Sequence, residues 1–114
     1  MDIEQTLIAW LSNKLQIPVS GDVPEDRPEK FITIERTGGG DKNIAFEDPQ
    51  IAIQCWAQTR YEAAKLADEV SDIMPDFSFE PHIHSVYKNS HYNFPDPDSR
   101  MGRYQILYQL VTRY

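Results

Sequence analysis

Several side chains in this sequence could carry chemistry, and each must be weighed against a structural role. Three histidines, His82, His84 and His91, could supply nitrogen ligands to zinc. His82 and His84 are two residues apart, which would place them on one side of a strand, but the sequence specifies no fourth ligand. We therefore interpret the histidines as part of a sheet surface and expect no metal site.

The cysteine and two aspartates are the other candidates for reactive groups. Cys55 alternates with Ile51 and Ile53, a pattern that favours a small core residue over a nucleophile. Asp96 and Asp98 could act as an acid and base pair only if their environments separated their pKa values, whereas carboxylates in a proline-rich loop are usually solvated. No serine lies in a Gly-x-Ser-x-Gly elbow. We expect neither a catalytic site nor a cofactor.

Three consecutive glycines, Gly38, Gly39 and Gly40, could suggest a phosphate-binding loop. Such a loop runs from a strand into the N-terminus of a helix, and in the P-loop it carries Lys-Ser/Thr. Here the glycines lie between two expected strands, so the pattern predicts a hairpin tip, where glycine tolerates positive φ. Together with the apolar residues Ile44 and Phe46, they are candidates for contact with a neighbouring subunit.

The charge balance argues against a protein that grips nucleic acid. The 114 residues include 18 Asp or Glu and 11 Lys or Arg, a net charge of -7, whereas a phosphate-tracking surface is basic. One cysteine cannot form an internal disulfide, and the first residues are acidic where a signal peptide would be basic. No apolar run approaches the ~18 residues of a transmembrane helix. We expect a protein of the reducing cytoplasm with no membrane association.

Periodicity predicts two helices. Apolar residues recur every four positions from Ile3 to Leu15, which predicts a helix over about residues 2–16. Thr59 followed three residues later by a glutamate has the spacing of a capping box, and it predicts a second helix over about 60–74 that a proline then ends.

Alternating residues predict four strands, joined in part by a stiff proline-bearing loop. The strands are expected at residues 31–37, 50–58, between Pro81 and His91, and 103–114, with the loop at 94–98. The order helix, strand, strand, helix, strand, strand predicts one α+β domain over residues 1–114. We expect an antiparallel sheet of about four strands with both helices packed on one face.

The second face of this sheet is the strongest candidate for function. If Ile53 and Cys55 face the helices, Trp56 must point away from them. On the last strand the same face carries Gln105, Leu107 and Gln109, a mixture more typical of an interface than of a solvated sheet. Either loops and helix ends of the same chain cover this face, or another subunit does. We expect a subunit contact to which Trp56, Gln105, Leu107 and Gln109 contribute.

The succession of segments resembles the tail terminator (tail completion) proteins of long-tailed bacteriophages and their prophage relatives. The resemblance covers nearly the whole chain, and it lies in the order and spacing of several phrases rather than in any single one. These phrases are Ile17-Pro18-Val19, Val23-Pro24, Arg27-Pro28, Glu35-Arg36-Thr37-Gly38-Gly39, Ile53-Gln54-Cys55-Trp56-Ala57, Glu62-Ala63-Ala64-Lys65-Leu66-Ala67, Phe94-Pro95-Asp96-Pro97 and Arg103-Tyr104-Gln105-Ile106.

The resemblance implies a structural virion protein that forms a ring, expected as a hexamer, at the head-proximal end of the tail tube. The ring would end tube polymerisation and dock to the head connector, so its partners would be copies of itself, the major tail tube protein and the connector. DNA would pass through the lumen without specific binding, which suits an acidic chain. Such a protein assembles in the host cytoplasm and resides in the virion tail. The alternatives are another head-to-tail joining protein and a small host binding module.

Overall fold

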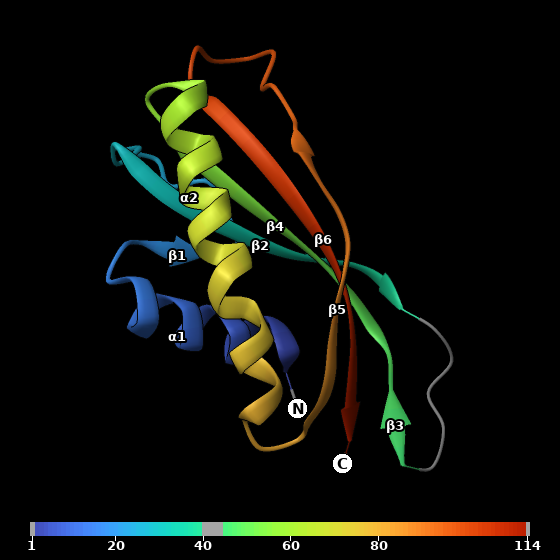
Figure 1. Ribbon diagram of the computed structural model, residues 1–114. Coiled ribbons are helices and arrows are strands. Elements are labelled where there is room, and N and C mark those ends of the chain that lie inside the picture. The colour runs from blue at the N-terminus through green and yellow to red at the C-terminus, as the bar shows by residue number, and fades with distance from the viewer. Residues whose placement is uncertain (1, 40–44, 114) are drawn as a thin grey trace.

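Two helices lie on one side of a six-stranded mixed sheet in the computed structural model, which describes residues 2–39 and 45–113 (Figure 1). The elements run in the order α1 (Ile3–Leu15), β1 (Val19–Ser20), β2 (Lys30–Gly39), β3 (Phe46–Glu47), β4 (Pro49–Ala57), α2 (Arg60–Ile73), the 3-10 helix η1 (Met74–Phe79), β5 (Ile83–Asn93) and β6 (Gly102–Arg113). The chain is therefore α+β, as the sequence predicts.

Both predicted helices are confirmed, and local hydrogen bonds explain their starts. The side chain of Asp2 accepts a bond from the backbone N–H of Gln5 at the N-terminus of α1. The Thr59 hydroxyl accepts from the backbone N–H of Glu62 at 3.1 Å, the first half of the expected capping box. Pro75 does not end the helical segment, because the chain continues into η1 with this proline in its first turn, where no N–H is needed.

The sheet differs from the prediction of four antiparallel strands. Its order is β1-β2-β4-β6-β3. Strands β4 and β3 pair with successive parts of β6, and β5 pairs with the opposite edge of β6. The short strand β1 lies parallel to β2, with Val19 opposite Ile32, so the sheet is mixed. The predicted element order is wrong for the same reason: two-residue strands such as β1 and β3 are too short to produce an alternating pattern.

The core fills the space between the helices and one face of β2, β4 and β6. Alternate residues of these strands are buried there, including the fully buried Ile34, Ile53, Cys55 and Ile106. Trp10 of α1 packs against Phe77 of η1 with ring centroids 5.0 Å apart, which joins the first helix to the segment after the second. The assignment of Cys55 to the core is confirmed.

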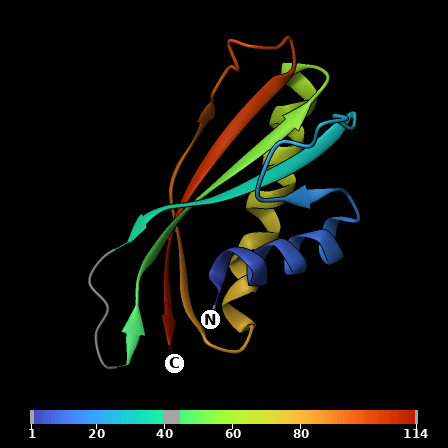
Figure 2. The same cartoon turned by 180° about the vertical axis from the view of Figure 1, so that it is seen from behind.

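The paired ends of β2 and β4 extend beyond both helices (Figures 1 and 2). Pairing continues as far as Gly39 opposite Pro49, past a bulge between Arg36 and Gly38, and it contributes to a long molecule of 45 × 25 × 25 Å. We call the described end of this hairpin, residues 37–39 and 46–49, the arm. The expected hairpin is therefore present, but Gly38 and Gly39, which the sequence placed at its tip, continue its first strand.

Replacing Cys55 by serine should lower the free energy of unfolding by about 1–3 kcal/mol, because a hydroxyl would replace the thiol at a fully buried position of the hydrophobic core. Burial raises the pKa of the Cys55 thiol, so the native protein should also resist thiol reagents, which attack the thiolate. Denaturant unfolding followed by circular dichroism measures the first effect. A serine variant as stable as the native protein would contradict the core assignment.

Candidate interaction face

Neither α1 nor α2 covers the sheet face that is turned away from them (Figure 2). Residues directly opposite one another on paired strands point to the same side, so the register identifies its members. We call the part of this face beyond Trp56 the open face; its residues are Thr33, Glu35, Gln50, Ala52, Gln54, Ser85, Tyr87, Ser90, Tyr92, Gln105, Leu107, Gln109 and Val111.

Trp56 lies at one end of this face and is covered by the chain itself. Its ring stacks on Phe31, with centroids 5.3 Å apart and an angle of 11° between the planes. The guanidinium groups of Arg103 and Arg27 lie 4.8 and 5.3 Å from the Trp56 ring centroid. As a result, only 2% of Trp56 is exposed.

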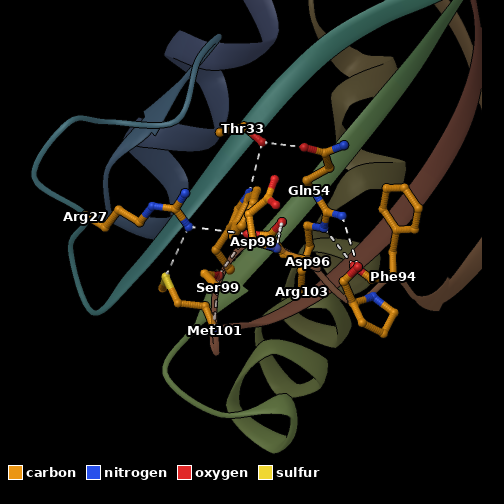
Figure 3. A network of polar contacts seen from close by, with 11 residues as sticks. Arg27, Thr33, Gln54, Phe94, Asp96, Asp98, Ser99, Met101 and Arg103 are labelled. Carbon is orange, nitrogen blue, oxygen red and sulfur yellow. Dashed lines mark hydrogen bonds and ion pairs between the residues drawn. The ribbon is translucent and has the colours of Figure 1, made fainter.

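The two arginines, which lie against the Trp56 ring, belong to a network of polar contacts that joins two loops (Figure 3). Arg27 lies 3.6 Å from the carboxylate of Asp96, which also accepts a 2.8 Å bond from the hydroxyl of Ser99. Arg103 donates to the carbonyl oxygen of Phe94 at 2.7 Å. We call these side chains, Arg27, Asp96, Ser99 and Arg103, the clasp. The proline-bearing loop is therefore tied down rather than free in solvent.

The prediction that Trp56 anchors a subunit contact loses its basis. It rested on the tryptophan being left uncovered, and the structure instead shows the alternative, in which loops of the same chain cover it. Strand alternation gave the correct direction of the side chain. It could not show that residues around positions 27 and 96 would meet above it.

A chain of hydrogen bonds crosses the face from β4 to β5. The indole N–H of Trp56 donates to the Thr33 hydroxyl at 3.1 Å, and that hydroxyl donates to the Gln54 side-chain oxygen at 2.9 Å. The Gln54 amide donates to the Gln105 oxygen at 2.8 Å, and the Gln105 amide in turn donates to the Tyr92 hydroxyl. These polar groups satisfy one another, so they have little need of water.

The structure places the predicted contact residues in two separate groups. Gln105, Leu107 and Gln109 lie on the open face, where Gln105 is 8% exposed and Leu107 and Gln109 are half-buried. Gly38, Gly39 and Phe46 lie on the arm, where Phe46 is 36% exposed and packs against His84 with ring centroids 5.4 Å apart. Gly40 and Ile44 lie outside the described residues.

The sequence did not identify the aromatic residues of β5. Tyr87 is 66% exposed, and its ladder partner is Gln109, whereas Tyr92 is 37% exposed and lies opposite Gln105. The two tyrosines are five positions apart, which in a regular strand would place them on opposite faces. A shift in register between Lys88 and Ser90 returns them to the same face, and this is why β5 alternates only weakly.

Charge is nearly absent from the open face. Of all residues in the chain, 25% are charged, but the open face includes a single carboxylate, that of Glu35 on β2. The charged residues of β5 and their partners lie toward α2, where Lys88 donates to Ser71 at 2.7 Å and His91 lies 3.8 Å from Asp68. The face therefore combines tyrosine, aliphatic and mutually bonded amide side chains.

The histidines occupy different surroundings. His82 has a φ of 70° in the turn before β5, so it does not share a strand with His84 as the sequence suggested. Within the described residues, no three or more His, Cys, Asp or Glu side chains group so that they could hold a metal ion. No helix in the described part of the chain has the length and apolar character needed to cross a membrane.

The sequence matches no protein-family model and no curated protein. The open face and the arm are the features of the fold that bear on function, together with the resemblance carried by the sequence segments.

Replacing Trp56 by alanine should destabilise the single chain by about 3–5 kcal/mol, because a buried indole is lost beneath the clasp. The matched control is Trp56→Phe, which keeps a ring between Phe31 and the arginines but loses the bond to Thr33, at an expected cost of about 1 kcal/mol. Denaturant unfolding measures both. An alanine variant that unfolds like the native protein would show that the clasp does not depend on the indole.

Asp96 should contribute to acid stability. The Ser99 hydroxyl, and next the backbone N–H of Asp98, lower the pKa of its carboxyl group. Such a group stabilises the fold above the ordinary aspartate pKa of about 4, and the contribution is lost as pH falls through the lowered value. Asp96→Asn should therefore flatten the loss of stability below about pH 4, measured by acid unfolding, whereas the control Asp98→Asn should retain it. Equal acid profiles for the native protein and Asp96→Asn would refute this role.

Proposed function

We propose that this chain is a structural subunit that assembles with copies of itself into a ring, a hexamer, at the head-proximal end of the tail tube of a long-tailed bacteriophage. The ring ends polymerisation of the tube and docks to the head connector. The observation that carries the proposal is the open face, a charge-poor surface with exposed tyrosines that neither α1 nor α2 covers. The resemblance of the sequence segments to tail terminator proteins supplies the biological setting.

The composition of the open face favours contact with protein over contact with water. Interface cores are depleted of charge and enriched in tyrosine, whereas a solvated sheet face is mostly polar or charged. Here Tyr87, Leu107 and Val111 lie among amides whose hydrogen bonds are already made within the chain. Little desolvation cost therefore opposes covering the face, and each aromatic side chain that a partner buries removes about 150–250 Å² from water.

The charge of the chain restricts where copies can meet. Each copy carries a net charge of -7, so copies repel one another unless their contacts avoid the acidic surfaces. Contacts through the open face place the acidic residues of the helix side away from the junction, where solvent and salt screen them over about 8 Å. The same acidic balance suits a lumen through which DNA passes without being held.

The two alternative functions predict different behaviour of the purified protein. A different head-to-tail joining protein would assemble but would leave tail tubes uncapped, and a small host binding module would show no affinity for tubes. Electron microscopy of the purified protein mixed with tail tubes separates these cases. Rings at one end of tubes of uniform length support the proposal, and tubes that remain bare and continue to grow contradict it.

Tyr87→Glu should abolish self-association and tube capping, because it introduces an unpaired charge into the open face. The matched control is Tyr61→Glu: Tyr61 is 76% exposed, against 66% for Tyr87, but lies in the first turn of α2, where a carboxylate favours the helix dipole. Sedimentation and microscopy of capped tubes measure the effect. If both variants assemble alike, the open face is not the subunit contact.

A further inference from the structure

The arm continues the open face and is not a second surface. One row of paired residues crosses the sheet where the two meet: Gly38, Gln50, Gln109 and Tyr87. This end also carries Asp48, one carboxylate oxygen of which is buried with no hydrogen-bond partner among the described residues. A surface that meets only its own copy closes at a dimer, so a ring built on the open face needs a different surface to receive it.

The first helix offers such a surface, because its outer side is uncharged. From Gln5 to Leu15, α1 holds a single charged residue, Lys14. The Lys14 ammonium lies 5.8 Å from the ring centroid of Trp10, which is buried in the core, so it is turned toward the inner side of the helix. Spacings of three and four residues place the remaining members on the outer side. We call these residues the α1 stripe; they are Gln5, Ala9, Ser12 and Asn13.

The second helix differs from the first in the charge of its exposed side. The exposed charged residues of α2 are Arg60, Glu62, Lys65, Asp68, Glu69 and Asp72. Covering them with the open face would remove charges from water opposite a surface that has only Glu35 to pair with them. The α1 stripe brings no charge to such a contact, so the open face suits α1 better than α2.

The length and the side chains of α1 suit the part of the open face beside β5. The 13 residues of α1 extend over about 20 Å at ~1.5 Å each. Tyr87 and Tyr92, five positions apart, are separated by about 16 Å at ~3.3 Å per residue, so α1 is long enough to contact both. Small side chains of the stripe, Ala9 and Ser12, leave room for the two aromatic rings, because large and small residues on facing surfaces interdigitate.

We infer that the α1 stripe of one copy lies on the open face of the next, along Leu107 and between Tyr87 and Tyr92. This inference rests on the ring proposed above and names the surface that receives the open face. Because α1 lies on the opposite side of the sheet from the open face, the contact joins two different surfaces (Figures 1 and 2). It is therefore head-to-tail, and repeating it can close a ring. The end of the face that carries Asp48 stays outside the contact.

Two variants that each damage one half of the contact test the inference by complementation. Ala9→Glu puts a charge at an exposed position of the α1 stripe, and Tyr87→Glu puts one on the open face. Each variant alone should remain a folded monomer, with self-association weakened by about a hundredfold. An equimolar mixture should form a heterodimer and nothing larger, because only the stripe of the Tyr87→Glu copy and the face of the Ala9→Glu copy are intact.

The matched control is Lys65→Glu, at an exposed position of α2, which makes the chain more acidic than Ala9→Glu does and should still assemble. Sedimentation and native mass spectrometry measure the species, with circular dichroism melting as the check on folding. If Ala9→Glu assembles like the native chain, or if the mixture of folded variants remains monomeric, the inference is wrong. Native protein that caps tail tubes in the same experiment shows that the ring proposal survives this failure. Native protein that neither assembles nor caps tubes overturns both.

Discussion

Side-chain alternation along β4 and β6 is the constraint on which the rest of the molecule depends. The residues that fill the core beneath the helices, such as Ile53 and Ile106, oblige their neighbours to point to the opposite face. That second face therefore carries large and polar side chains that α1 and α2, on the other side of the sheet, do not cover. At one end of the face, the chain covers these side chains itself, because Arg27 and Arg103 lie against the Trp56 ring and hold two loops over it. Along the rest of the face, the ring that we propose would supply the cover from another copy.

The hydrogen-bond chain from Trp56 to Tyr92 links the covered end of this face to the open face. It joins β2, β4, β6 and β5 through side chains alone, and it consumes donors and acceptors that would otherwise bind water. A sheet face whose polar groups bond to one another in this way differs from a solvated surface, where such groups bond to water, and from a closed core, where few polar groups occur. It costs little to dehydrate, which is the property that a permanent subunit contact needs and that a monomeric protein does not.

Features encoded by neighbouring residues could be predicted from the sequence, whereas those encoded by distant residues could not. The apolar period from Ile3 to Leu15, the capping spacing at Thr59 and the alternation around Cys55 are local. They predicted both helices, the principal strands and the direction of Trp56. The clasp joins Arg27 to Asp96, and no local pattern indicates that pairing. The bulge in β5 hid the alignment of Tyr87 with Tyr92, because an irregular strand breaks the period on which the prediction depends. The contribution of β5 to the open face was therefore found only in three dimensions.

Hydroxyl-radical footprinting of tyrosines, comparing dilute monomer with the assembled protein, tests most directly whether the open face is the subunit contact. Tyr87 and Tyr92 lie on that face, and Tyr61, which is 76% exposed on the helix side, serves as the internal reference. Assembly should protect Tyr87 and Tyr92 from oxidation severalfold and leave Tyr61 unchanged, because burial in an interface excludes the reagent along with water. Unchanged oxidation of Tyr87 in assembled protein, or protection confined to Tyr61, would contradict the assignment of the open face.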